Sequence, residues 1–164
     1  MISKKVAEAI NDQINMEYYS AFLYLDMSSS MDDKGFRGYA SWLFLQYKEE
    51  LEHAEKFIAY LQSRGEQPNL MKIDAPEEVP NVPLIVAEAA YGHEVKVSRS
   101  IDKIYALACK EQDFATASFL KWFIDEQVEE EETTSEIVDL FKLAGEGVGA
   151  LFSIDQKLGS RTPE

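Results

Sequence analysis

A carboxylate and an imidazole stand three residues apart in the segment Glu50-Leu51-Glu52-His53. The flanking residues follow the apolar period of a long helix, and side chains at positions i and i+3 project from the same helix face. Glu50 and His53 should therefore point together into the interior of the fold. Such a pair is typical of a metal site, because a carboxylate oxygen and an imidazole nitrogen can both bind one cation.

Three other helical stretches carry a polar residue at a similar depth in their apolar stripes. The spacing places Glu17 inward in the first stretch, Glu94 in the third, and Gln127 with Glu130 in the fourth. Four buried carboxylates in one layer would repel one another strongly, and no Lys or Arg lies on these stripes at that level. Two divalent cations would cancel the four charges. The predicted ligands are Glu17, Glu50, His53, Glu94, Gln127 and Glu130.

Oxygen and imidazole ligands without a thiolate suit iron or manganese, and zinc would also bind. Ligand spacing alone does not choose among these metals. Gln127 has a second interpretation, since a core amide can also hydrogen-bond across helices. A metal-free polar layer competes as an interpretation of the other residues, but it would leave four buried charges without a cation.

The elements that must position these residues are all helical. A chain of 164 residues is long enough for one domain, and its five prolines are bunched, with four of them between positions 68 and 83. We expect a single domain over residues 1–164. The apolar period predicts bundle helices at about 4–31, 36–64, 83–110 and 113–143, and a short amphipathic helix at about 147–158.

The links between helices predict the topology. A short polar turn at 32–35 and a link that ends at Asp113, a good N-cap residue, make the first helix antiparallel to the second and the third antiparallel to the fourth. The link at 65–82 can reach roughly 60 Å, whereas the second helix is roughly 40 Å long. It can therefore cross the whole bundle. The expected fold is an all-α antiparallel four-helix bundle with one long crossover and a short fifth C-terminal helix.

Composition excludes several classes of function. Thirty acidic residues against sixteen basic ones give a net charge of -14, which disfavours nucleic acid and anionic membranes and favours cations. The sequence shows no signal peptide and no apolar stretch long enough to cross a bilayer. Cys109 is the only cysteine, which suits a reduced, cytoplasmic setting, and it is expected to be a small buried residue. His93 is expected on an outer face, because it points roughly 100° away from Glu94.

Three parts of the sequence closely resemble the non-haem ferritins of bacteria and archaea: the Glu50 to His53 motif, Asn11 to Ser20, and Phe119 to Glu132. The resemblance covers essentially the whole chain, including its length, the crossover position and the fifth helix. It implies a homo-oligomeric hollow shell of 24 subunits. It also implies that this shell oxidises Fe(II) with O2 or H2O2 at a di-iron ferroxidase centre and stores Fe(III) as a mineral.

The resemblance further implies roles for individual residues. Glu17, Glu50 and His53 would hold the first iron, with Glu50 bridging, and the second iron would be served by Glu94, Gln127 and Glu130. A third iron site would use Glu49, Glu126, Glu129 and Glu130. Tyr24 matches a tyrosine beside the centre and would be a one-electron donor. Haem is not expected, because the fourth helix lacks a second Glu-x-x-His and Leu51 replaces the methionine of bacterioferritins.

Alternatives remain at this stage. The same bundle could serve a di-metal enzyme, such as an oxygenase, a radical generator or a manganese catalase, that stores no iron. A helical interaction protein without metal would tolerate Glu50→Ala, since that change removes a buried charge. A DNA-protecting miniferritin is disfavoured by the net charge and by the lack of a Lys-rich arm.

Glu49, Glu126 and Glu129 could belong to the surface instead of a third site. The apolar face of the fifth helix suggests a subunit contact.

Overall fold

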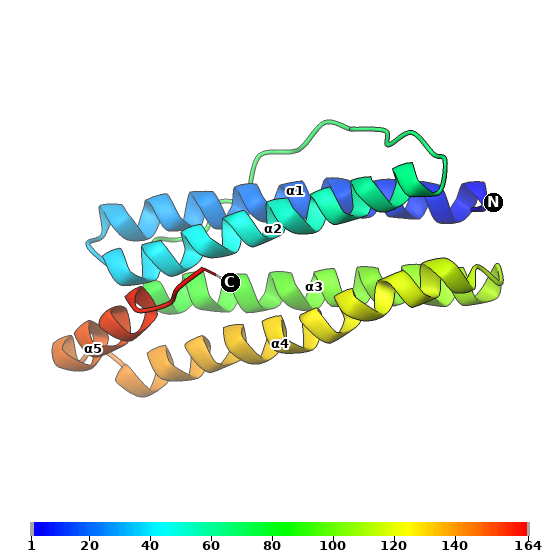
Figure 1. Cartoon of the computed structure of the whole chain (residues 1–164). Helices are drawn as coiled ribbons and strands as arrows, with labels where there is room; N and C mark the ends of the chain where they lie inside the picture. Colours follow the sequence, from blue (N-terminus) through cyan, green and yellow to red (C-terminus); the bar gives the residue numbers. More distant parts are fainter. Residues whose placement is uncertain (1, 164) are drawn as a thin grey trace.

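Five α-helices make up the fold in a computed structural model that describes residues 2–163 (Figure 1). They are α1 (Lys4–Asp33), α2 (Arg37–Ser63), α3 (Pro83–Lys110), α4 (Phe114–Ala144) and α5 (Val148–Gly159). The expected all-α bundle with a short fifth helix is confirmed, and each helix ends within two residues of its expected boundary. None of the helices in the described residues is long and apolar enough to span a membrane.

Local capping explains where the helices begin and end. The Ser3 side chain accepts a hydrogen bond from the Val6 backbone N–H at the start of α1, and Asp113 does the same for Thr116 at the start of α4. Pro83 opens α3, where its missing N–H costs nothing. The chain leaves the α1–α2 turn through Gly35, whose φ of 85° lies in the left-handed region that suits glycine.

The long crossover is fastened along the outside of α1. Asn69 donates its backbone N–H to the Asn11 side chain at 2.7 Å, and the Asn15 amide donates to the Lys72 carbonyl at 2.9 Å. One turn further along α1, the Tyr19 hydroxyl accepts from the Glu77 backbone N–H. These three contacts carry the loop back along the bundle, so α2 and α3 run parallel and the one-crossover topology is confirmed (Figure 1).

Apolar packing fills the bundle on both sides of a polar layer at mid-length. At one end Tyr39 packs against Phe141, with ring centroids 5.2 Å apart. At the other end Phe57 stacks on Phe123 at 4.1 Å. Burying each such aromatic side chain stabilises the fold by about 1.5–3 kcal/mol. The two apolar clusters thus hold the four helices in register at the level of the polar residues between them.

Two expectations about α3 are wrong. His93 is buried, with 6% of its surface exposed, and its Nε2 lies 2.6 Å from the Ser20 hydroxyl. The buried arc of α3 is wider than one stripe, because Tyr19 and Ser20 of α1 pack against His93, so His93 and Glu94 are buried together. Cys109 is exposed instead of buried, since the inward position of the last turn is taken by Ala108.

Helix α5 packs on α2 through a very close backbone approach. Ile154 and Leu158 are buried, and the Tyr39 N–H donates to the Asp155 carboxylate at 2.9 Å. A Cβ atom added to Gly38 would lie 1.8 Å from the Asp155 carbonyl oxygen, so only glycine allows this contact. The expected apolar face of α5 therefore has two parts. Leu158 is buried against the rest of the chain, whereas Val148 and Phe152 are exposed.

We expect Gly38→Ala to push α5 away from α2. The added methyl group cannot fit against the Asp155 backbone, and the lost packing should destabilise the protein by about 1–3 kcal/mol, measured as a fall in melting temperature. Gly92→Ala is the matched control, because apart from the backbone of its own helix turn and its chain neighbours no atom lies within 4 Å of a Cβ at this position. That control should be neutral or stabilise by about 0.5–1 kcal/mol. Equal melting temperatures for Gly38→Ala and wild type would contradict this account of the α5 contact.

Candidate metal centre

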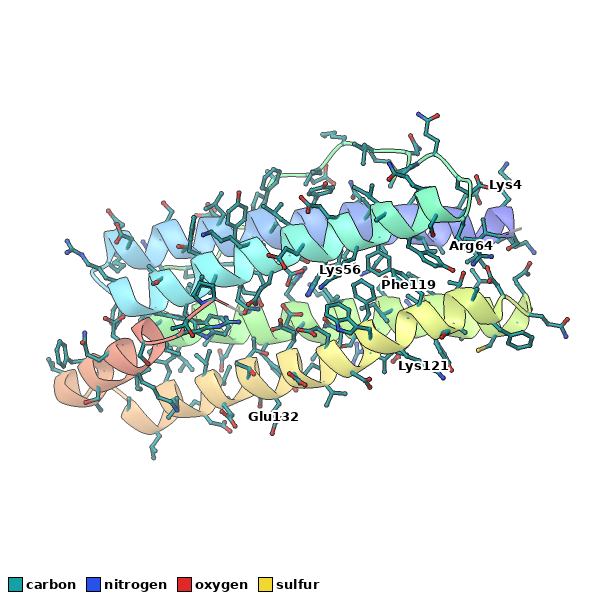
Figure 2. The ribbon with its side chains drawn as sticks, viewed as in Figure 1. Lys4, Lys56, Arg64, Phe119, Lys121 and Glu132 are labelled. Atoms are coloured by element: carbon teal, nitrogen blue, oxygen red, sulfur yellow. The ribbon has the colours of Figure 1, made fainter. Side chains whose placement is uncertain are left out.

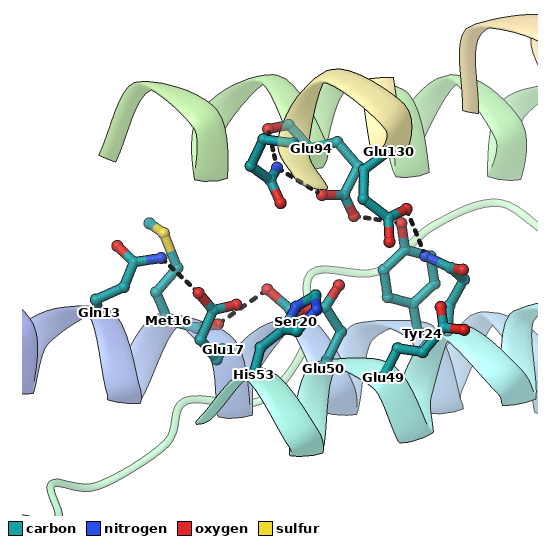
Figure 3. Close-up of polar contacts among 12 residues, drawn as sticks. Gln13, Met16, Glu17, Ser20, Tyr24, Glu49, Glu50, His53, Glu94 and Glu130 are labelled. Atoms are coloured by element: carbon teal, nitrogen blue, oxygen red, sulfur yellow. Dashed lines mark hydrogen bonds and ion pairs between the residues drawn. The ribbon is translucent and has the colours of Figure 1, made fainter. Parts of the chain in front are cut away.

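Polar side chains from all four bundle helices meet in the layer between the two apolar clusters (Figure 3). The helical spacing of three and four residues points each of them inward. Of the four predicted carboxylates, Glu17 and Glu94 are fully buried and Glu130 is the most exposed, at 7%. The layer holds all the residues predicted for the two-metal site: Glu17, Glu50, His53, Glu94, Gln127 and Glu130.

One half of the layer has ligand geometry. Glu17, Glu50 and His53 each offer a ligand atom, and these atoms all lie within 4.8 Å of one another. The Nδ1 atom of His53 is 3.5 Å from Glu50 Oε2. One oxygen of Glu17 accepts from the Gln13 amide at 2.8 Å, but Glu17 Oε2 and Glu50 Oε2 have no hydrogen-bond partner. Buried carboxylate oxygens without donors are costly, so this group fits a cation well.

The other half of the layer holds two carboxylates, Glu94 and Glu130, each of which accepts hydrogen bonds from neighbouring side chains. Glu94 accepts from the Tyr24 hydroxyl on one oxygen and from the Gln127 amide, 3.1 Å away, on the other. Glu130 accepts from the Gln46 amide at 2.8 Å. Gln127 therefore acts as a hydrogen-bond donor to Glu94 in this structure, and metal binding through its oxygen stays a prediction. Figure 3 shows Glu94 and Glu130 facing Glu17, Glu50 and His53 across the bundle.

Burial sets the protonation of the layer. Desolvation, only partly offset by hydrogen bonds, raises the pKa of Glu17 to about 7. Desolvation and then repulsion from Glu94 raise the pKa of Glu50 well above its usual range, and the same two causes raise that of Glu130. Burial, with the nearby Lys56 charge, lowers the pKa of His53 to about 4. At neutral pH the imidazole is therefore ready to bind a metal, whereas the carboxyl groups must first release protons.

The residues predicted for a third site are only partly brought together. Glu49 and Glu126 are half-buried and line one cavity of about 110 Å3 with His53, on the side of the bundle between α2 and α4. Glu129 is exposed and does not line this cavity. Beside the same cavity, the Trp122 ring stands edge-on to His53 with a centroid distance of 5.6 Å.

Sequence reasoning missed one charged partner of this region. Arg161, which follows α5, donates to both oxygens of Glu49 at 2.8 Å and also to the Gln46 side chain. Its position after the fifth helix carries no periodic signal that could place it beside α2. The stripes themselves contain no Lys or Arg, as expected, but the tail supplies a cation at the edge of the layer.

A four-helix bundle with one long crossover and a buried carboxylate and imidazole layer defines the ferritin-like class of metal proteins. The family model described as Ferritin-like domain matches residues 7–144. A bacterial non-heme ferritin of Bacteroides fragilis is 42% identical over 164 residues, covering 98% of this chain and all of the relative. One from Staphylococcus haemolyticus is 36% identical over 162 residues, covering 99% and 98%. The chain belongs to the ferritin family, among the non-haem ferritins of bacteria and archaea.

Solved structures agree with this assignment. An open pore ferritin from the archaeon Archaeoglobus fulgidus superposes with a TM-score of 0.97 at 41% identity, covering 99% of this chain and 100% of the other. A closed form of the A. fulgidus ferritin, engineered by mutagenesis, gives the same TM-score and identity with full coverage of both chains. The buried Glu17, Glu50 and His53 group is consistent with an iron site in such a protein.

We expect Glu50→Gln to weaken binding of the first two Co²⁺ ions per chain by at least about tenfold, because the change replaces a charged ligand with a neutral amide. The melting temperature of the metal-free protein should stay the same or rise, since a buried carboxylate oxygen without a donor is removed. Calorimetric titration and thermal melting measure the two effects. Glu52→Gln, at an exposed position on the same helix, should change neither. Wild-type affinity in Glu50→Gln would exclude a metal centre here.

We also expect metal affinity to depend on pH. Below about pH 7 Glu17 carries a proton that a cation must displace, so this one group should lower Zn²⁺ affinity by about fivefold between pH 7 and pH 6. Glu17→Gln should give a shallower slope, and a slope equal to that of the wild type would contradict the prediction. The same raised pKa stabilises the metal-free protein at low pH, and this contribution is lost as the pH rises from 4.5 through about 7.

Proposed function

We propose that the protein is an iron-storage ferritin, which oxidises Fe(II) with O2 or H2O2 at the buried centre and deposits Fe(III) mineral inside a hollow shell of 24 subunits. The observation that carries the proposal is the group of Glu17, Glu50 and His53, whose ligand atoms lie within 4.8 Å of one another. Two of its buried carboxylate oxygens have no hydrogen-bond donor. Membership of the ferritin family makes iron the cation that this group would take.

The layer as a whole suits iron oxidation. Glu17, Glu50 and His53 would hold one Fe(II), and Glu94 and Glu130, with Gln127, would hold the second. Each ion gives one electron to the same oxidant. Four carboxylates in a site of low dielectric favour Fe(III) over Fe(II), because the ion of higher charge gains more from them. Glu49, Glu126 and Glu129, with Glu130, would receive a third iron next to this pair.

Tyr24 is suited to supply a further electron. It is fully buried, and its hydroxyl donates to the Glu94 carboxylate. Burial and the charge of Glu94 raise the pKa of the phenol well above its usual range, so it stays protonated at neutral pH. When the phenol gives an electron to the centre, its proton can pass along the existing hydrogen bond to Glu94. The electron and the proton thus leave together, without a charged phenol radical in the core.

Exposed apolar side chains support assembly into a shell. In the described chain, five large apolar side chains are at least 65% exposed: Leu70, Phe114, Leu143, Val148 and Phe152. Three of these lie at the end of α4 and on α5, where the chain itself offers no cover. Burying them between identical subunits would remove this apolar surface from water. We further propose that residues 1–164 form one domain, and that the shell works in the cytoplasm, where the exposed thiol of Cys109 stays reduced.

Aerobic iron loading tests the proposed function. We expect that after excess Fe(II) is added in air, size exclusion will elute iron with a particle many times the 18.6 kDa chain mass, at far more than three iron atoms per chain. Glu50→Gln should load more slowly, and Glu52→Gln should load like wild type. If loading stops at about two iron atoms per chain, or if the particle is small, storage is excluded and a di-metal enzyme becomes the better assignment.

A further inference from the structure

The chain turns back toward the bundle after α5 (Figure 1). This tail, residues 160–163, brings Arg161 against α2, where its guanidinium lies 5.0 Å from the centre of the Trp42 ring. The side chains of Arg161 and Glu49 are 22% and 20% exposed, so their ion pair is mostly shielded from water. A shielded, stacked guanidinium is held more firmly than an ordinary surface charge.

Arg161 fixes two acidic side chains at the edge of the metal centre. Its Nη2 donates to both oxygens of Glu49 at 2.8 Å, so each carboxylate oxygen accepts a hydrogen bond from Arg161. Its Nη1 donates to the side-chain amide oxygen, Oε1, of Gln46. This contact sets the orientation of the Gln46 amide, whose nitrogen then donates to Glu130 at 2.8 Å. Arg161 thus acts on Glu49 directly and on Glu130 through one amide.

The tail also lies at the most open side of the bundle. In the described chain, no Cα atom of α2 comes within 8 Å of one in α4. The cavity on this side is lined by Glu49, His53 and Glu126, and also by Pro163 of the tail. Figure 2 shows Lys56 pointing into the space between the helices on this side. A cation that approaches Glu49 therefore meets the tail and its guanidinium.

We propose that Arg161 is a positioning residue that holds Glu49 while the centre is metal-free and gives it up when a cation binds beside Glu49. Arg161 thereby sets the affinity of the third cation position, an inference that rests on the proposed function. Two effects act in the same direction. The guanidinium competes for both Glu49 oxygens, and its positive charge repels a second positive ion a few ångströms away. Lysine could not make both contacts in the same way, because Arg161 uses one guanidinium nitrogen for Glu49 and the other for Gln46, whereas lysine has a single nitrogen.

Titration of the assembled, metal-free protein with Zn²⁺ tests the role of Arg161. The background is Trp122→Phe, so that Trp42 reports on the tail without a second tryptophan beside His53. We expect Trp42 emission to change as the third Zn²⁺ per chain binds, because Arg161 leaves the ring. In Arg161→Gln this third ion should bind at least about threefold more tightly, and its binding should leave Trp42 emission unchanged.

Three further variants test whether the change in affinity for the third Zn²⁺ comes from the contact between Arg161 and Glu49. Lys157→Gln removes the same charge from an exposed position at the same end of the chain and leaves the contact of Arg161 with Glu49 in place, so it should bind the third Zn²⁺ like the background protein. Arg161→Lys keeps the charge but loses the paired contacts with Glu49 and Gln46, so its affinity for the third Zn²⁺ should lie between those of the background protein and Arg161→Gln. Glu49→Gln should lose the third ion.

The proposal is overturned if Arg161→Gln binds the third Zn²⁺ with unchanged or weaker affinity, or if Lys157→Gln strengthens it equally. It is also overturned if the background protein binds two Zn²⁺ per chain and no variant binds a third, in which case the two-metal centre stands. Failure to bind the first two ions in the background protein is a different result, because it removes the proposed function itself.

Discussion

The structure depends on the cost of burying four carboxyl groups in one layer of a helical bundle. Glu17, Glu50, Glu94 and Glu130 lie where water cannot solvate their charges. Burial raises the carboxyl pKa values in this layer, and amides and a phenol donate hydrogen bonds to the carboxylates. One oxygen of Glu17 and one of Glu50, the two Oε2 atoms, have no donor, and the imidazole of His53 lies beside them. In the proposed function, relief of this cost would give a cation its affinity.

The remaining structure can be understood as support for that layer. Apolar clusters at both ends of the bundle supply the stability that the polar layer costs, and they fix the depth at which the four helices meet. The crossover keeps α2 and α3 parallel, so that residues from both helix pairs face one another. Helix α5 closes against α2 through Gly38 and carries the tail toward Glu49. Each of these parts thus helps to place the carboxylates or a side chain that contacts them.

The sequence allowed the fold and the inward residues of the layer to be predicted, because periodic burial and capping are local signals. Gln46, Glu50 and His53 share one stripe of α2, and one face of one helix can be read without knowing its neighbours. His93 and Cys109 were misplaced because burial also depends on what packs against a helix from outside, as α1 does at His93. Arg161 was missed for a related reason. Its contacts join residues more than 100 positions apart, and no local pattern encodes them.

The fastening of the crossover has a consequence for how the chain folds. The two helix pairs, α1 with α2 and α3 with α4, are joined by short turns, so most of their contacts are local and form without closing a long loop. The contacts of Asn11, Asn15 and Tyr19 with the crossover span 57 or 58 residues and cannot form as early. Until they do, the crossover is a tether that keeps one helical hairpin at high effective concentration beside the other. Its length therefore influences the rate at which the two halves meet, as well as the direction in which they pack.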